Sequence, residues 1–539
     1  MTEAVEATPA APAPQKQTPS SGGAAWLVAA GILLSRLAGL IRQRVLGYYL
    51  ATSPAADAYT AALRIPNFLQ NLLGEGVLSA SFIPVYAALR ARGEDAKARS
   101  VAGGVAGLLS LVTGALALIG IAASPWLVDL IAPGFSGETR ALAIVLVRIF
   151  FPGISLLVLS AFCLGVLNSH HRFFLSYAAP VVWSAAIIVA LVLGAHAGPP
   201  GDQDRIAIWA AWGAVAGGAL QLLVQLPQVL RLLGKGFRLS LGRGDPHVKE
   251  VVRNFLPVVA GRGVVQLSAY VDMLIASFMP SGTVAAFGYA QTIYLLPVSL
   301  FGMSVSAAAL PSMSAEAEAP DKLHAQTEAG LRAIAFPVVP TVAAFLLLGD
   351  VICAALFQTG KFSADDTRYV WYFLIGSTVG LLAATMGRLY SSAFYALRDT
   401  RTPLRYATIR VLLTAGLGVF GALSLPGLLH LPARFGALGL TGSAGIAGWI
   451  EFALLRRRLA ERIGECRLPK GLLPRLWASA ALAVGVGFVA KMALPAVHPI
   501  WRAIVVLGLF GAVYLGFTLG LGVSEARQAL ARVRRLLGR

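Results

Sequence analysis

Charged side chains and cysteines are scarce in this sequence, and each shortage excludes a class of protein. Only 13% of the 539 residues are charged, about half the share found in soluble domains. The three cysteines, Cys163, Cys353 and Cys466, have no metal-ligand spacing, so we expect no disulfide framework and no metal site. No glycine-rich loop precedes a lysine and a serine or threonine, which argues against a built-in ATPase. We therefore expect a membrane protein that is not an enzyme.

Long apolar segments are abundant instead, since 57% of the residues are hydrophobic. A helix that spans a bilayer needs about 20 mainly apolar residues. The start of the chain, 1–23, is rich in Ala, Pro, Thr and Ser and is expected to be a disordered tail. The remainder predicts fourteen transmembrane helices, at 24–50, 56–88, 101–131, 141–168, 173–195, 206–230, 254–279, 283–314, 333–356, 369–396, 404–425, 434–455, 474–495 and 501–522.

Basic residues gather in alternate loops between these segments, as in Arg90-Ala91-Arg92 and Arg456-Arg457-Arg458. Lysine and arginine mark the cytoplasmic loops of membrane proteins, so this pattern places both termini in the cytoplasm, including a basic tail at 523–539. The same pattern accounts for the formal charge of +19. No nucleic-acid partner is expected.

The chain also repeats itself. Phe135-Ser136 recurs as Phe362-Ser363, and Pro84 recurs as Pro311, each at an offset of 227 because 362 − 135 and 311 − 84 both equal 227. Six helices per copy put the two copies in the same orientation, as in transporters built from parallel repeats. We expect an all-α fold with two six-helix lobes, 24–233 and 251–458, plus an additional helix pair at 474–522.

Ionisable side chains inside these helices are candidate functional residues, because each is costly in a bilayer unless it faces water or a partner. The first lobe holds Arg36, Arg42, Asp57, Arg64 and Glu75. One interpretation is a cationic cavity wall that suits a phosphate or pyrophosphate head group. The alternative is structural: Arg42 and Arg44 reach the membrane interface, and Arg36 pairs with Glu75.

The second predicted helix is interrupted by Pro66 and by Gly74-Glu75-Gly76, an irregularity that a membrane tolerates only where it is buried in protein or faces water. In the second lobe, Asp272 is a candidate site for a sodium ion or a proton, or else a neutral, hydrogen-bonded residue. Arg388 and Arg410 are expected to extend toward the membrane interface.

The motifs of the second helix resemble those of the MurJ (MviN) family of lipid II flippases, in the multidrug/oligosaccharidyl-lipid/polysaccharide exporter superfamily. The similarity runs in order along roughly 30–410. It is carried by Ser35-Arg36, Ile65-Pro66-Asn67, Gly74-Glu75-Gly76, Ala132-Pro133-Gly134-Phe135, Gly360-Lys361-Phe362 and Asp399-Thr400-Arg401-Thr402-Pro403.

This resemblance implies fourteen helices in the bacterial cytoplasmic (inner) membrane and transport by alternating access. The implied substrate is a lipid-linked peptidoglycan precursor, undecaprenyl-pyrophosphate disaccharide-pentapeptide, moved from the inner to the outer leaflet. Membrane lipids and the cell-wall synthesis machinery are the implied partners. The family's essential cavity charges correspond to Arg36, Arg42, Asp57 and Glu75, with Arg64 where a basic residue is common.

The sequence departs from the family at three positions. Gln70 and Thr292 stand where arginines are usual, and Gln43 stands where an aspartate is frequent. Arg262 is a candidate replacement for the missing charge in the cavity. Asp272 falls where some relatives place a sodium ligand, which favours ion coupling.

Two other interpretations stay open at this point. The protein could export another lipid-linked oligosaccharide, or it could be a cation-coupled drug efflux transporter of the same superfamily. The second of these interpretations is a membrane scaffold for cell-wall synthesis. A cavity wall with arginines favours an anionic substrate, because a pump for cationic drugs would be expected to carry carboxylates there.

Overall fold

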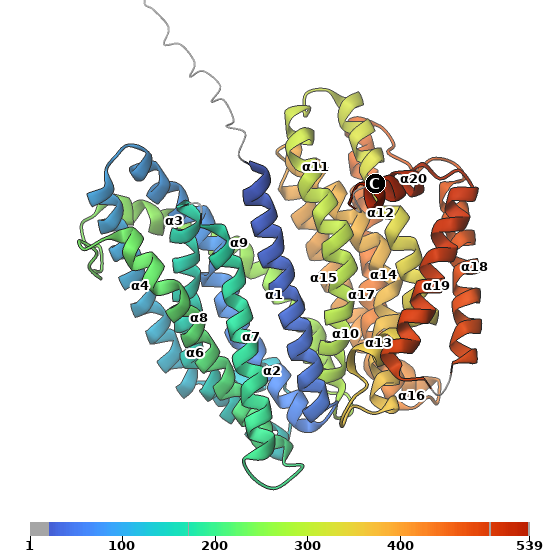
Figure 1. Ribbon diagram of the computed structural model, residues 1–539, viewed down its shortest axis with the longest axis horizontal. Helices are drawn as coiled ribbons and strands as arrows, with labels where there is room; N and C mark the ends of the chain where they lie inside the picture. Colours follow the sequence, from blue (N-terminus) through green and yellow to red (C-terminus); the bar gives the residue numbers. More distant parts are fainter. Residues whose placement is uncertain (1–20, 171, 495–496, 537–539) are drawn as a thin grey trace, which may run out of the picture.

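The computed structural model describes residues 21–170, 172–494 and 497–536, and these form helices and connecting loops without a strand. The helices stand side by side in two lobes, which meet at one end and diverge toward the end that carries the C terminus (Figure 1). Their length and apolar composition agree with a protein that crosses a membrane many times.

The first lobe contains the following helices in chain order: α1 (Ser21–Leu50), α2 (Pro54–Leu73), α3 (Glu75–Ala91), α4 (Asp95–Ala122), α5 (Ser124–Ile131), α6 (Gly137–Ser169), α7 (Phe173–His196) and α8 (Gln203–Leu233). The second lobe contains α10 (Thr283–Pro297), the π-helix η1 (Val298–Met303), α11 (Ser304–Ala315), α12 (Pro320–Leu347), α13 (Gly349–Phe357), α14 (Ala364–Ala396), α15 (Arg401–Val419), the π-helix η2 (Phe420–Ser424), α16 (Leu425–Leu428), the 3₁₀ turn η3 (Ala433–Phe435) and α17 (Gly436–Ile463). The helices α18 (Leu472–Ala493), α19 (Pro499–Gly520) and α20 (Ser524–Leu536) follow. The helix α9 (Pro246–Ser277) contacts α3 and α4 of the first lobe as well as α10 and α15 of the second.

Twelve helices in the described part of the chain are long and apolar enough to span a membrane. The expected spans 24–50 and 254–279 coincide with α1 and α9, which are helical but are not among the twelve. The all-helical, many-spanning fold is therefore confirmed, whereas the count of fourteen stays a prediction.

The expected span 56–88 comprises α2 and α3, which meet at Gly74. Two further spans also combine two helices each. The segment 101–131 consists of α4 and the short α5, and 333–356 consists of the end of α12 and α13. Ser124-Pro125 starts α5 because proline fits the first turn of a helix but not its interior. Gly349 is the first residue of α13. Apolar composition alone does not show such breaks.

The repeat of 227 residues reappears in the helix boundaries. The helices α6 and α14 both contain 33 residues and begin at 137 and 364, and 364 − 137 is 227. Gly74, which ends α2, corresponds in the second copy to residue 301 (74 + 227), and this lies within η1. The second helix of each copy is thus irregular at the equivalent place.

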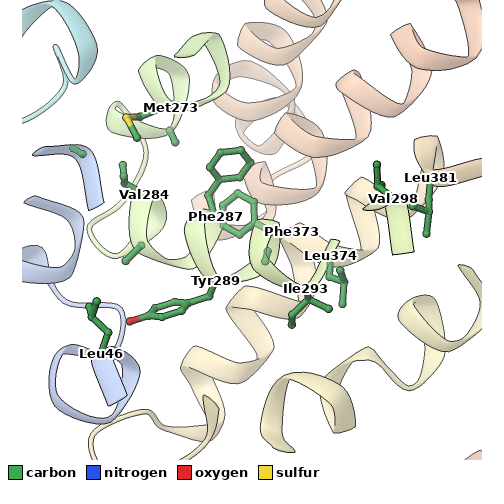
Figure 2. Close-up of a cluster of buried hydrophobic side chains, with 14 of the residues drawn as sticks. Leu46, Met273, Val284, Phe287, Tyr289, Ile293, Val298, Phe373, Leu374 and Leu381 are labelled. Carbon is green, nitrogen blue, oxygen red and sulfur yellow. The ribbon is translucent and has the colours of Figure 1, made fainter. Parts of the chain in front are cut away.

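The second lobe is held together by aromatic and aliphatic side chains between α10 and α14. Figure 2 shows Phe287 beside Phe373, with ring centroids 5.8 Å apart, and Ile293 near Leu374. Tyr289 extends from the same helix toward Leu46 of α1 (Figure 2). One face of α10 therefore packs into its own lobe, while Tyr289 reaches the other lobe.

The pair α18 and α19 is attached to the second lobe by a largely buried ion pair. Lys491 Nζ lies 2.6 Å from Asp350 Oδ2, and the two side chains are 11% and 24% exposed. The ammonium group also lies 5.7 Å from the ring of Trp371. A charge pair with so little solvent is costly to break, because the remaining partner is left without compensation.

We expect Lys491→Ala to lower the free energy of unfolding by about 3 kcal/mol, since it leaves the Asp350 carboxylate unpaired. The double variant Asp350→Asn/Lys491→Met should recover most of this loss, because neither partner is then charged. Thermal unfolding in detergent measures both. Equal stability of the single variant and the unmodified protein would contradict the assignment.

Candidate functional site

A polar cavity of about 490 Å³ lies between the two lobes. Its first-lobe wall comes from α1, α2, α6, α7 and α8, and its opposite wall from α9 and α10. Side chains that can bind a phosphate or a sugar by charge or hydrogen bonds dominate its polar part: Arg42, Gln43, Tyr59, Thr60, Arg64, Asn67, Gln70, Asn71, Gln221, Tyr270, Tyr289, Gln291 and Thr292.

Arg42 is held in this wall by an aromatic ring. Its guanidinium carbon lies 4.5 Å from the centroid of the Trp183 ring on α7, a cation–π geometry that orients the group without neutralising it. Its N–H groups therefore stay available for an oxyanion, which the flat, forked guanidinium binds with two hydrogen bonds. The structure thus brings a cation to the cavity where the sequence predicted one.

Arg64, on α2, is the second arginine in the wall. Its backbone carbonyl accepts a hydrogen bond of 2.9 Å from the hydroxyl of Tyr270 on α9, and the ring of Tyr270 meets Phe68 edge-on at 5.4 Å. These contacts join α2 to α9 beside the cavity. No aspartate or glutamate is among the residues that form this wall in the described part of the protein.

The three departures from the family pattern, Gln43, Gln70 and Thr292, all line the same cavity. Thr292 Oγ1 donates a hydrogen bond to the carbonyl of Gly288 at 3.1 Å, within its own helix. Neutral amides and hydroxyls thus occupy places where charge is usual. The cavity keeps a net positive wall through Arg42 and Arg64.

Asp57 is placed at the junction of the lobes and is not among the cavity-lining residues. Its carboxylate accepts hydrogen bonds from the backbone N–H groups of Gly282, at 2.6 Å, and Ala285, at 2.7 Å. These are the first amides of α10, where a helix favours a negative charge. In this conformation Asp57 caps a helix of the opposite lobe, and its assignment to the substrate stays a prediction.

Further contacts close the lobes at the same end. Arg44 donates hydrogen bonds to the carbonyls of Ala355 and Leu356, at 2.5 and 2.8 Å, at the C-terminal end of α13. The N–H of Lys361 donates to the carbonyl of Tyr48 at 2.9 Å. Gly360 has a φ of +59°, and an added Cβ would lie 2.6 Å from that carbonyl oxygen. We call these contacts, together with those of Asp57, the inter-lobe seal.

The structure gives little information on the roles of three other predicted site residues. Arg36 lies six residues before Arg42 on α1, about 9 Å along the axis; it is exposed and is not part of the cavity wall. Glu75 and Arg262 belong to α3 and α9, but their side chains lie outside the described residues. The roles predicted for all three stay predictions.

Asp272 lines a second, smaller cavity of about 190 Å³ within the second lobe. Its Oδ1 is buried and has no hydrogen-bond partner in the described part of the structure. Arg410 stands in the wall of the same cavity and pairs with Glu451 at 3.3 Å. The Arg410 side chain is 38% exposed. The expectation that Arg410 and Arg388 extend toward the membrane interface stays a prediction.

These residues fit a sodium ion poorly. Sodium favours carboxylate, hydroxyl and carbonyl oxygens, as other hard cations do, and Asp272, Thr414 and Thr441 could supply some of them. A guanidinium in the same wall repels a second cation, however. No group of three or more His, Cys, Asp or Glu side chains that could hold a metal ion occurs in the described residues.

The motif residue Asp399 and the three cysteines have structural roles that fit their sequence context. Asp399 precedes α15 and accepts hydrogen bonds from the N–H and the hydroxyl of Thr402, at 3.0 and 2.7 Å. The bond from the backbone N–H, with the nearby Arg462 guanidinium, holds the pKa of Asp399 below its ordinary value. The three cysteines are free and buried, and burial raises the pKa of Cys466 to about 11, so it stays a thiol.

Sequence reasoning missed Trp183 and Tyr270, and it considered Arg44 only as a residue that reaches the membrane interface. Each contributes through a tertiary contact: a ring beneath Arg42, a cap on α13 and a bridge to the backbone of Arg64. Trp183 follows the apolar pattern of α7, and Arg44 is the third arginine of α1. The charge of Arg44 inside an apolar helix drew attention to it, whereas no sequence signal indicated the contacts of Trp183 and Tyr270.

The fold is found among solved structures. One titled "Lipid II flippase MurJ, inward closed conformation" superimposes with a TM-score of 0.74 at 24% identity, covering 92% of this chain and 98% of that one. An inward-facing multidrug resistance MATE family transporter of the MOP superfamily gives a TM-score of 0.64 at 18% identity, with 81% and 98% of the two chains covered. The chain therefore has the fold of these structures, and it is a helical protein of two lobes with a polar cavity between them.

Sequence comparison identifies the family. The family model described as lipid II flippase MurJ matches residues 46–517. A probable lipid II flippase MurJ of Rhizobium meliloti (strain 1021) is 30% identical, with 94% of this chain and 95% of the relative covered. The lipid II flippase MurJ of Burkholderia cenocepacia is 31% identical, with 80% and 82% covered. This chain belongs to the MurJ family of lipid II flippases.

Proposed function

We propose that this protein is a flippase that carries lipid II, the undecaprenyl-pyrophosphate-linked peptidoglycan precursor, from the inner to the outer leaflet of the bacterial cytoplasmic membrane. The observation that carries the proposal is the cavity wall, which presents Arg42 and Arg64 with neutral amides and hydroxyls. Arginines suit the pyrophosphate, and amides and hydroxyls suit the sugars and the peptide. The protein acts as a transporter and catalyses no covalent step of its own.

The inter-lobe seal supports alternating access. The lobes are joined by hydrogen bonds at the end opposite the C terminus and diverge toward the C-terminal end (Figure 1). With both termini in the cytoplasm, as the basic loops predict, this conformation is closed toward the outside. The head group would then enter from the cytoplasmic side and leave after the seal opens.

The cavity argues against a pump for cationic drugs. Such a substrate would need carboxylates, and none lines the cavity among the described residues, whereas two arginines do. The wall alone does not distinguish lipid II from another pyrophosphate-linked oligosaccharide, but membership of the family favours lipid II. Assembly with the cell-wall synthesis machinery is a further expectation from this role.

Reconstitution in vesicles tests the function. Lipid II with a fluorescent head group should become accessible to a membrane-impermeant quencher on the opposite face only when the protein is present. A fluorescent phosphatidylglycerol serves as the control lipid and should not be translocated faster than in empty vesicles. The proposal fails if labelled lipid II keeps its leaflet, or if both lipids are translocated equally fast.

Energy for the cycle is proposed to come from the membrane potential and a proton. A unit charge that crosses the full potential gains about 2.3 kcal/mol per 100 mV, so an inside-negative potential draws the empty cationic lobe toward its inward-facing state. A proton is the exchangeable ion that suits Asp272, because a carboxyl group without a partner can accept one where a metal ion is repelled.

We expect Asp272→Asn, which imitates the protonated acid, to remove the dependence of transport on a pH gradient while downhill flipping continues. The matched control is Asp399→Asn, a carboxylate in a loop outside the cavities. Flipping assays in vesicles with and without an imposed pH gradient provide the measurement. An Asp272→Asn protein that still responds to the gradient would contradict the proton assignment.

A further inference from the structure

The wall of the smaller cavity in the second lobe contains a carboxylate, on Asp272, and a guanidinium, on Arg410. Its polar wall comprises Asp272 from α9, Arg410 and Thr414 from α15, Tyr294 from α10 and Thr441 from α17. Glu451 lies one turn beyond Gly448, another lining residue, and pairs with Arg410. Four helices thus contribute these polar groups to one recess.

Gln291 connects this recess to the main cavity, because it lines both of them. Among the described residues, Arg64 of the main cavity and Arg410 of the recess are close enough to Asp272 to interact with its charge. Asp272 is therefore placed between the cationic wall of the transport cavity and the interior of the second lobe.

Charge balance explains why an arginine occupies this position. A buried carboxylate is costly in a membrane unless a cation accompanies it, and the recess adjoins two, on Asp272 and Glu451. Arg410 is bonded to one of them at 3.3 Å and lies in the wall that contains the other. Arg388, on α14, is close enough to interact with Arg410 and Glu451, which adds positive charge to the same region.

We propose that the Arg410 guanidinium is a covalently attached cation that takes the place of a dissociable metal ion in the second lobe, so that transport requires no sodium. A tethered cation needs no binding step and cannot be lost when the lobe opens, since it moves with α15. The inference rests on the proposed flippase activity. It adds that this chain differs, through Arg410, from a transporter driven by a sodium gradient.

Removal of the tethered cation should create a requirement for a free one. We expect the unmodified protein to flip lipid II equally fast in sodium and in potassium buffers and to show no saturable binding of radioactive sodium. Arg410→Ala should flip about ten-fold more slowly or worse, as expected when charge balance inside a membrane protein is lost. Added methylguanidinium or sodium should restore a large part of the rate.

Two variants provide controls. Arg410→Lys keeps a tethered positive charge and should retain sodium-independent flipping. Arg388→Ala removes a neighbouring guanidinium that has no hydrogen bond or ion pair within the described residues, and methylguanidinium should not change its rate. Size-exclusion profiles and thermal unfolding show whether each variant is folded, and the sodium tests on the unmodified protein apply even if Arg410→Ala does not fold.

The inference is overturned if the unmodified protein needs sodium or binds it saturably. It is also overturned if Arg410→Ala flips at the normal rate without an added cation, or is folded and responds to none. A failure of the proposed function looks different, because the unmodified protein would then flip no lipid II in any salt.

Discussion

Arg42→Ala is expected to abolish lipid II flipping while the protein inserts and folds normally. Loss of one partner from a desolvated charge pair costs about 2–5 kcal/mol, which corresponds to a fall in rate of roughly thirty-fold to several thousand-fold. Arg42 has a position in the cavity wall and a supporting ring, Trp183, but no ion pair among the described residues. The assay is complementation of a flippase-depleted bacterium at matched expression, together with flipping in vesicles.

Control variants separate the effect of the positive charge of Arg42 from the effect of the shape of its guanidinium. Arg42→Lys should retain part of the activity, because a lysine supplies the charge but not the fork of donors. Trp183→Leu should weaken substrate binding more mildly, since it removes only the support. Arg36→Ala is expected to abolish flipping as well, through a step in which α1 presents that side chain to the head group. Normal complementation by both alanine variants would refute the assignment of a pyrophosphate clamp.

Asp57→Ala is expected to open the inter-lobe seal. The substitution removes two hydrogen bonds that the carboxylate accepts from backbone N–H groups at the start of α10. At about 1.5 kcal/mol each, this amounts to about 3 kcal/mol. A shift of this size changes the ratio of closed to open molecules roughly a hundred-fold. Flipping should fall strongly, because a transporter that does not close toward the outside cannot reload from the cytoplasm.

A thiol introduced into the seal reports the opening directly. Ala58→Cys is suitable because Ala58 is fully buried and the three natural cysteines are buried as well. A membrane-impermeant maleimide added outside should label Ala58→Cys slowly in the otherwise unmodified protein and much faster with Asp57→Ala. Asp365→Asn, an exposed carboxylate near the same end, should leave the labelling rate unchanged. Equal labelling with and without Asp57→Ala would show that the cap does not hold the lobes together.

The sequence anticipated the features that depend on local pattern. Apolar segments of sufficient length predicted a many-spanning helical protein, since the bilayer leaves few alternatives to the helix. The recurrence of Phe135-Ser136 as Phe362-Ser363 predicted an offset that α6 and α14 reproduce. Charged residues in apolar helices predicted Arg42 and Arg64 as part of a cavity. Breaks such as that before α5 were not anticipated, because apolar composition continues across them.

What the sequence alone determined is therefore the membrane class, the helical periodicity and the inventory of intramembrane charges, because burial in lipid acts on each segment separately. Only the tertiary structure decided what those charges do. Asp57 and Arg42 looked alike as candidates for the substrate, yet one caps α10 and the other stands over Trp183 in the cavity. Arg410 forms an ion pair with Glu451, which belongs to a helix some forty residues away in the chain. The energy of a charge in a membrane depends on its nearest partners, and helix packing, which no local pattern encodes, chooses those partners.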